Sequence, residues 1–245
     1  MLKITKSYRS DYKGEDIVTE RVYDHQQWHS QTEYVANAVF NYQISKQAVV
    51  IGNGLTQKDF DINIIMKHQG GLLGETRLQT YGCNALFRDY KPDFLVISDR
   101  VVAEEAVLNG YAKDHICYSR ANILLEFPKR FYLTPMDPVT DAGTTAAYIA
   151  CFDGHKKVFL LGFDGQDTYN FNYNVYCNTN GYDAKHHDIK DFKWVADKAI
   201  LFHTYDDVEF IWVTKTGMHN IPEAWKECPN FRQINTREFV LEGNL

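Results

Sequence analysis

Several apolar runs in this sequence are followed by glycine, asparagine or aspartate. Residues of these types commonly form nucleotide-binding sites. Gly52-Asn53-Gly54 follows the first run, and glycine amides can approach a phosphate or ribose without a side chain in the way. Asn84 follows a second run, and its amide can both donate to and accept from a base or ribose edge. Asp99 and Asp164 follow two later runs. Because each group comes where a strand is expected to end, we interpret them as one ligand site.

The stretch from Asp141 to Asp164 is the centre of this arrangement. Asp141 can cap a helix whose first turn contains Gly143 and Thr144, and such small residues let a ligand approach the free amides. A helix start of this kind binds anions. Residues 158–161 are apolar throughout, as in a buried strand, so that Asp164 is expected at a carboxyl edge of the sheet. An ordinary helix and strand with a well-formed cap would explain the same residues.

Two adjacent histidines are candidates for proton transfer. His186 and His187 precede a helix expected over residues 188–202, and an imidazole that titrates near neutrality can act as a general base. The same pair also fits a solvated helix start with Asp188 as its cap. We therefore expect His186 and His187, together with Asp164, to be catalytic. The sequence does not indicate which of the two histidines is the base.

The segment 165–182 is long and aromatic for a connection between two elements. Tyrosines such as Tyr169 are interspersed with asparagines there, and side chains of this kind offer flat apolar faces with polar ends. Long loops in compact domains are usually lids or binding loops. We expect this segment to be a lid that stacks on a sugar or a base.

These residues support two kinds of transferase and one binding protein. In a sugar transfer, a histidine would accept a proton while the amides at Gly143 and Thr144 stabilise the departing phosphate, with no metal required. In a pyrophosphoryl transfer, Asp99 and Asp164 would hold Mg²⁺ against a nucleoside triphosphate. A non-catalytic nucleotide-binding protein is the third reading, favoured if both aspartates are buried and already paired.

Several segments together resemble one superfamily, the bacterial lipooligosaccharide sialyltransferases and the related hydroxymethyl-dihydropterin pyrophosphokinases. Residues 50–54 (Val-Ile-Gly-Asn-Gly) are similar to the glycine-asparagine-glycine turn of that group. Gly82-Cys-Asn84 and Lys91 to Asp99 resemble the pyrophosphokinase-like branch. Gly143, Gly154 and Gly162-Phe-Asp164 fall at the spacing of the sialyltransferase motifs. The resemblance covers residues 47–214 and implies a Rossmann-like core and transfer from a nucleotide-sugar donor to a small-molecule or glycan acceptor.

The sequence also departs from the family pattern. Leu55-Thr56 follows Gly54 where the family turn continues with proline and serine, and Asp141-Ala142 stands where the sialyltransferases have two hydroxyl residues. Thr144 or Thr145 would have to supply the missing hydroxyl. The family histidine proposed as general base lies a few residues away from His186 and His187 in an ungapped alignment.

The composition limits the partners. The chain has 245 residues, a net charge of −6 and 44% hydrophobic residues, which fits a globular protein and argues against a general nucleic-acid binder. It lacks an apolar run of the roughly 18 residues that a membrane span needs, so that we expect a soluble cytoplasmic protein without a transmembrane segment. The five scattered cysteines form no CxxC pair and make a zinc site unexpected. Self-association into a homo-oligomer stays open.

The elements that must position these residues alternate between strand and helix. This alternation predicts an α/β fold with a Rossmann-like, doubly wound, mostly parallel sheet over residues 47–245, preceded by a peripheral segment, 1–46, with one helix near 33–42. Strands are expected at 47–51, 77–84, 93–99, 115–119, 158–161 and 208–214. Helices are expected at 57–67, 85–90, 100–111, 142–151, 188–202 and 221–227. The prolines between 128 and 138 predict irregular edge structure over 121–138.

Overall fold

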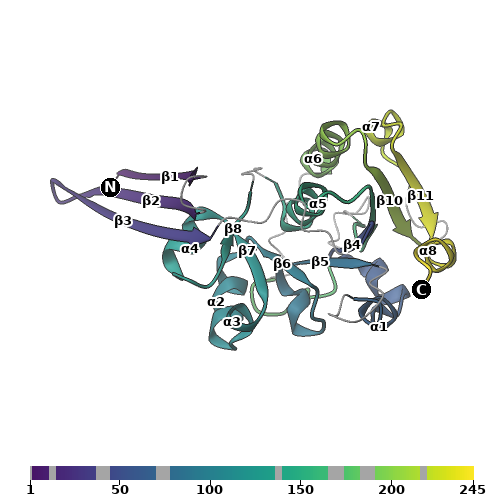
Figure 1. Cartoon of the computed structure of the whole chain (residues 1–245), viewed down its shortest axis with the longest axis horizontal. Helices are drawn as coiled ribbons and strands as arrows, with labels where there is room; N and C mark the ends of the chain where they lie inside the picture. Colours follow the sequence, from purple (N-terminus) through teal and green to yellow (C-terminus); the bar gives the residue numbers. More distant parts are fainter. Residues whose placement is uncertain are drawn as a thin grey trace.

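A computed structural model gives the arrangement of most of the chain. It describes residues 2–10, 15–36, 45–69, 78–135, 140–164, 174–182, 191–215 and 220–245. These residues form an eight-stranded sheet with helices on both faces and a separate three-stranded sheet at the N-terminal end (Figure 1). The predicted α/β, doubly wound architecture is confirmed.

Every neighbouring pair of strands in the large sheet is parallel. The order is β11-β10-β9-β4-β5-β6-β7-β8. The strands are β4 (Gln47–Ile51), β5 (Gln79–Cys83), β6 (Phe94–Ile97), β7 (Ile116–Ser119), β8 (Tyr132–Leu133), β9 (Lys157–Leu161), β10 (Glu209–Thr214) and β11 (Phe231–Asn235). The chain adds strands outward from β4 as far as β8, and then returns to place β9 on the other side of β4. The strand order therefore reverses between β4 and β9.

Helices cover both faces of this sheet (Figure 1). One layer contains α5 (Ala142–Phe152), α6 (Asp191–Thr204) and α7 (Glu223–Lys226). The other layer contains η1 (Leu55–Asp59), α1 (Ile62–Met66), η2 (Asn84–Arg88), α2 (Arg100–Leu108), α3 (Tyr111–Asp114), α4 (Ala121–Glu126) and α8 (Thr236–Gly243). Within the described part of the chain, each helix is too short or too polar to cross a bilayer.

The sheet separates two apolar cores. Alternate residues of β4 point to opposite faces, so that Val49 and Ile51 belong to one core and Ala48 and Val50 to the other. All four side chains are fully buried. Because both faces of each inner strand are covered, these strands read as continuous apolar runs in the sequence.

The N-terminal sheet projects beyond β8 as an arm (Figure 1). It consists of β1 (Leu2–Ser10), β2 (Glu15–Asp24) and β3 (Gln27–Ala36), paired antiparallel in that order. One of its faces packs on α4, where Val18 and Val35 are buried. The predicted helix at 33–42 is wrong for residues 33–36, which belong to β3, and residues 37–42 lie outside the described part. Pairing with β2 overrides the weak helical spacing there.

Two further expectations are corrected near the ends of the large sheet. Residues 121–126 form α4, although irregular structure was expected, because the first of the nearby prolines, Pro128, comes only after the helix has ended. The tail contains more than the predicted helix near 221–227, since β11 extends the sheet and α8 packs behind it.

Candidate functional site

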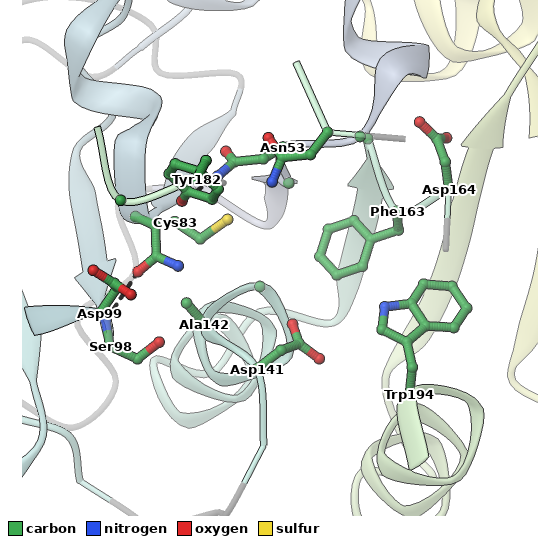
Figure 2. Close-up of a pocket in the computed structure, with 17 residues that line it drawn as sticks. Asn53, Cys83, Ser98, Asp99, Asp141, Ala142, Phe163, Asp164, Tyr182 and Trp194 are labelled. Atoms are coloured by element: carbon green, nitrogen blue, oxygen red, sulfur yellow. Dashed lines mark hydrogen bonds between the residues drawn. The ribbon is translucent and has the colours of Figure 1, made fainter. Parts of the chain in front are cut away.

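The strand reversal between β4 and β9 opens onto a pocket at the carboxyl ends of the strands. Its volume is about 310 Å³ (Figure 2). In open α/β sheets a crevice of this kind, at the point where the strand order reverses, is where ligands bind. The described lining residues are Gly52, Asn53, Gly54, Cys83, Asn84, Ser98, Asp99, Asp141, Ala142, Gly143, Gly162, Phe163, Asp164, Asn174, Gly181, Tyr182 and Trp194.

The floor of the pocket is formed by two interlocked turns. The amide of Gly52 donates to the carbonyl of Leu161 at 2.8 Å, and the amide of Gly54 donates to the carbonyl of Gly162 at 2.9 Å. A Cβ atom on Gly52 would lie 2.5 Å from that Gly162 oxygen, and one on Gly54 would lie 2.4 Å from Oδ2 of Asp164. The glycines are therefore required by the contact between the turns, and these two amides are not available to a phosphate.

Asp164 fastens the same turns together. Its Oδ2 accepts from the amide of Thr56 at 2.6 Å, and its Oδ1 accepts from the Thr56 hydroxyl. The Asp164 side chain is buried. The carboxylate thus holds η1 against the end of β9, which is a structural use of the residue proposed from the sequence as catalytic or metal-binding.

The first turn of α5 forms one wall of the pocket. Asp141 caps this helix as predicted, because its Oδ1 accepts from the amide of Thr144 at 2.9 Å. The Thr144 hydroxyl donates to Oδ2 of Asp141 at 2.7 Å. The amides of Ala142 and Gly143 belong to the first helical turn and have no acceptor within the helix. These two amides lie at the positive end of the helix dipole and are the backbone donors with which this wall can bind an anion.

A buried lysine lies behind this cap. Nζ of Lys198 is 3.2 Å from Oδ2 of Asp141 and donates to Oγ1 of Thr144 at 2.8 Å. Burial by itself raises the pKa of Asp141, but the Lys198 ammonium and the Thr144 hydrogen bonds outweigh it, so that the pKa of this carboxyl is lowered. Burial lowers the pKa of Lys198, and Asp141 partly opposes that change. The two residues form an ion pair at the edge of the pocket.

Asparagine side chains and a tyrosine form the opposite wall. Nδ2 of Asn53 donates to the hydroxyl of Tyr182 at 3.1 Å, whereas Oδ1 of Asn53 is buried without a hydrogen-bond partner among the described residues. Oδ1 of Asn84 accepts from the amide of Ser98 at 3.0 Å. Oδ1 of Asp99 accepts from the amide of Val102 at 3.0 Å and caps α2. Asn84 and Asp99 therefore fix adjacent strand ends while they line the pocket.

Residues 174–182 form part of this wall and are packed into the fold. The amide of Val175 donates to the carbonyl of Asn53 at 2.8 Å. At the other end of the segment, the Arg88 guanidinium donates to the carbonyl of Asn180 at 2.7 Å and pairs with Glu105 on α2. Tyr182 is buried. The C-terminal half of the expected lid, residues 174–182, is therefore a packed wall of the pocket, and its first residues, 165–173, lie outside the described part of the chain.

Aromatic rings cover the side of the pocket near α6. Figure 2 shows Phe163 and Trp194 next to each other, facing the cavity. Nζ of Lys198 lies 3.9 Å from the centre of the Trp194 ring, a cation–π contact along one face of α6. Across the cavity, burial and then the nearby Asp141 raise the pKa of the Cys83 thiol to about 12, so that it stays protonated and is not a nucleophile.

The structure brings together most of the site residues proposed from the sequence. The pocket is lined by Gly52, Asn53, Gly54, Asn84, Asp99, Gly143 and Asp164. Thr144 is buried directly behind it. Asp99 and Asp164, the pair proposed to share Mg²⁺, lie on opposite sides of the cavity (Figure 2). Among the described residues there is no group of three or more His, Cys, Asp or Glu side chains that could hold a metal ion. Tyr169, His186 and His187 lie outside the described residues.

Sequence reasoning missed Lys198, Trp194 and Cys83. Lys198 comes three residues after Val195, on the face of the helix that was expected to be apolar, and a lysine there is a detectable sign of a buried partner. Trp194 precedes Lys198 by one helical turn. Cys83 had no such sign, because an apolar strand commonly contains a cysteine.

The comparisons with known proteins leave the site to be interpreted from its geometry. No protein-family model, curated protein or solved structure matches this chain.

Proposed function

We propose that this protein is a nucleotide-dependent transferase that binds a nucleotide-sugar donor in the pocket between β4 and β9. The observation that carries the proposal is the position of the pocket at the strand reversal of a parallel sheet. Its volume of about 310 Å³ lies at the lower end of the roughly 300–1,000 Å³ typical of small-molecule sites. A cavity of this size suits one nucleotide better than a dinucleotide.

The walls supply the contacts that such a donor needs. The amides of Ala142 and Gly143 are placed to receive a phosphate at the start of α5. Phe163 and Trp194 offer ring faces for a base or a sugar. Asn53 contributes an amide oxygen that has no partner among the described residues, and a ligand donor that reached it would satisfy it.

The charge of the pocket favours a donor with few phosphate charges. Among the described lining residues, the carboxylates are Asp99, Asp141 and Asp164, and no lysine or arginine lines the cavity. Lys198 offsets Asp141 from behind. A nucleotide sugar with a single phosphate brings much less repulsion into this pocket than a nucleoside triphosphate. The proton acceptor in this proposal is His186 or His187.

The same charge pattern favours a second candidate, a Mg²⁺-dependent pyrophosphoryl transfer. A triphosphate would need a divalent cation, and Mg²⁺ is commonly held by one or two carboxylates together with substrate phosphates. Asp99 is half-buried and lines the cavity, so it is the carboxylate best placed for this role, whereas Asp164 is engaged by Thr56. The engagement of Asp164 also supports the third reading, a nucleotide-binding protein without turnover.

Thermal unfolding with and without nucleotides tests the proposal. We expect CMP or CDP, in EDTA, to stabilise the protein by about 2.7 kcal/mol at 100 times the dissociation constant. For a chain of this size this corresponds to a rise in the melting temperature of roughly 5–10 °C. CMP, CDP, ATP and GTP are each measured with EDTA and with MgCl₂. Flat melting curves for every nucleotide at millimolar concentration would contradict the proposal.

The variant Asp99→Asn separates the two transferase mechanisms. Asparagine caps a helix about as well as aspartate, so the change removes a charge and keeps the cap of α2. Without a metal, binding of the phosphate should become tighter, because one repelling charge is lost. With Mg²⁺ as a bridge, binding of ATP should become weaker. Glu104→Gln on the same helix removes a partly exposed charge outside the pocket and is the matched control.

Turnover decides between an enzyme and a binding protein. Hydrolysis or transfer from a CMP-sugar is measured in EDTA, with His186→Ala and His187→Ala as variants. Loss of a general base should lower the rate by roughly 10²–10⁴-fold. Nucleotide binding without any turnover would favour the non-catalytic reading. If turnover stops in EDTA and both histidine variants remain active, the pyrophosphoryl mechanism replaces the sugar transfer.

A further inference from the structure

The arm has two different faces. Antiparallel pairing places the even-numbered residues of β1 and β3 on the same face as the odd-numbered residues of β2. We call this the outward face. The opposite face rests on α4, where Val18 and Val35 are buried and Nε2 of Gln31 donates to the carbonyl of Leu125 at 2.7 Å. Helix α4 thus supports one face of the arm, and the described residues leave much of the other face exposed.

The outward face exposes large apolar side chains. Leu2, Tyr23 and Trp28 lie side by side across the three strands, and they are 53%, 40% and 53% exposed. The rings of Tyr23 and Trp28 are in contact, with their centres 5.2 Å apart. Tyr34, nearer to the large sheet, is 56% exposed. Exposed apolar side chains that cluster in this way are a common feature of interaction surfaces.

The positions of the apolar rows along this face are self-complementary. From the tip inward, the apolar row of Leu2, Tyr23 and Trp28 is followed by two mixed rows, centred on Arg21 and Thr19. The next row contains Ile17 and Tyr34. A two-fold axis between the two mixed rows would place the apolar row of one copy on the Ile17–Tyr34 row of another. Both apolar rows would then be covered at the same time.

We propose that the outward face of the arm binds the outward face of a second copy of this chain. The two three-stranded sheets then form a small sandwich around a two-fold axis, which is the commonest symmetry of a homodimer. Three strands of nine or ten residues have a flat footprint of roughly 450 Å² per copy. The two copies together bury about 900 Å² of flat footprint, without the additional area of protruding side chains. This value is near the ~1,000 Å² that a specific interface needs. An interface at the low end of the size range is typical of weak, reversible association.

The charges of the outward face predict how the dimer responds to salt. Arg21 and Lys6 lie in the two mixed rows, and neither makes an ion pair among the described residues. In the sandwich these cations of the two copies come close together. Salt screens their repulsion, so association should strengthen as the salt concentration rises. An anionic polymer or membrane on the same face would instead be released by salt.

Sedimentation velocity of the full chain, from about 1 to 100 μM and at 50 and 500 mM NaCl, tests the proposal. We expect a monomer–dimer equilibrium that is tighter at the higher salt concentration. Trp28→Glu should weaken it by at least about 30-fold, because a charge would replace a central aromatic residue. His29→Glu is the matched control, since His29 is exposed on the opposite face of the same strand. It should leave the dissociation constant within about threefold.

The same measurements can overturn the proposal. A wild-type chain that stays monomeric at 100 μM in both salts would do so. A dimer that survives Trp28→Glu would also overturn it. Such a dimer would form in another way, for example by pairing through the edge strand β1, which does not involve the Trp28 side chain. If Trp28→Glu fails to fold by circular dichroism, Tyr34→Asp replaces it. The salt response of the wild-type chain needs no variant, and weaker association at high salt would also contradict the sandwich.

Discussion

Replacing Asp153 with Asn should make the stability of this protein rise with pH between about pH 4 and 6.5. Asp153 and His155 lie at the end of α5, fully covered by the sheet and helix. The hydroxyl of Tyr81 on β5 donates to Oδ2 of Asp153 at 2.7 Å and lies 3.0 Å from Nε2 of His155. The cluster contains an acid and a base whose charged forms are both disfavoured by burial.

The two residues titrate in opposite senses. Burial raises the pKa of Asp153 from 3.8 to about 7, against the smaller opposing effect of the Tyr81 hydrogen bond. Burial lowers the pKa of His155 from 6.5 to about 4, against the smaller opposing effect of the Ser45 backbone. In the folded protein at pH 5.5, Asp153 therefore holds its proton and His155 does not, whereas both groups are charged in the unfolded chain.

The signs and sizes follow from linkage. As the pH rises from 3.8 to 7, the unfolded chain releases the Asp153 proton and the folded one keeps it, so stability falls by about 4 kcal/mol. As the pH rises from 4 to 6.5, the unfolded chain loses the His155 proton that the folded chain never held, so stability increases by about 3 kcal/mol. In the wild type these contributions nearly cancel below pH 6.5.

Urea unfolding followed by tryptophan fluorescence, in steps from pH 4 to 8, measures the effect. Relative to wild type, Asp153→Asn should gain about 1.4 kcal/mol per pH unit across the window, and His155→Asn should lose a similar amount. Asp206→Asn removes an exposed carboxylate from the same part of the fold and should leave the wild-type profile unchanged. The reasoning is refuted if Asp153→Asn and wild type follow parallel curves, because Asp153 would then be ionised in the folded protein.

Two further predictions concern the pocket. Gly52→Ala should lower the free energy of unfolding by about 1–3 kcal/mol, because its Cβ would lie 2.5 Å from the Gly162 oxygen. Gly143→Ala, whose closest contact would be 3.1 Å, should cost less, and equal losses in a denaturation series would contradict the interlocked turns. Arg88→Met should increase amide hydrogen exchange in residues 174–182, since it removes the guanidinium contacts with Glu105 and Asn180. Lys113→Met, at an exposed position of α3, is the control, and unchanged exchange after Arg88→Met would show that other contacts hold the segment.

The inner strands and the cap of α5 could be predicted because their signals are local. Residues 158–161 are apolar since both faces of β9 are covered, and Asp141 needs only the next three residues to act as a cap. The arm could not be predicted in this way. Most of β3 is exposed on both sides, so its sequence, Gln27 to Ala36, lacks the apolar alternation that marks a half-buried strand.

The sequence predicted the positions of the site residues better than it predicted their roles. Strand ends pointed to Gly52, Gly54 and Asp164, and these residues do line the pocket. However, the amides of Gly52 and Gly54 and the carboxylate of Asp164 are hydrogen-bonded to partners more than 100 positions away along the chain, on or beside the neighbouring strand. Spacing within one segment carries no information about such a partner, so a glycine turn that packs against another turn reads like one that binds a phosphate.

The interlocked turns beneath the pocket also bear on how its specificity can change. Gly52, Gly54 and Asp164 are so closely fitted that nearly any substitution there disturbs the folding of the sheet itself. The rings and thiol above them, at Trp194, Phe163 and Cys83, line the cavity and take no part in the hydrogen bonds between the turns. A laboratory selection for a new ligand should therefore accumulate its changes in these upper positions, while the turns below remain as they are.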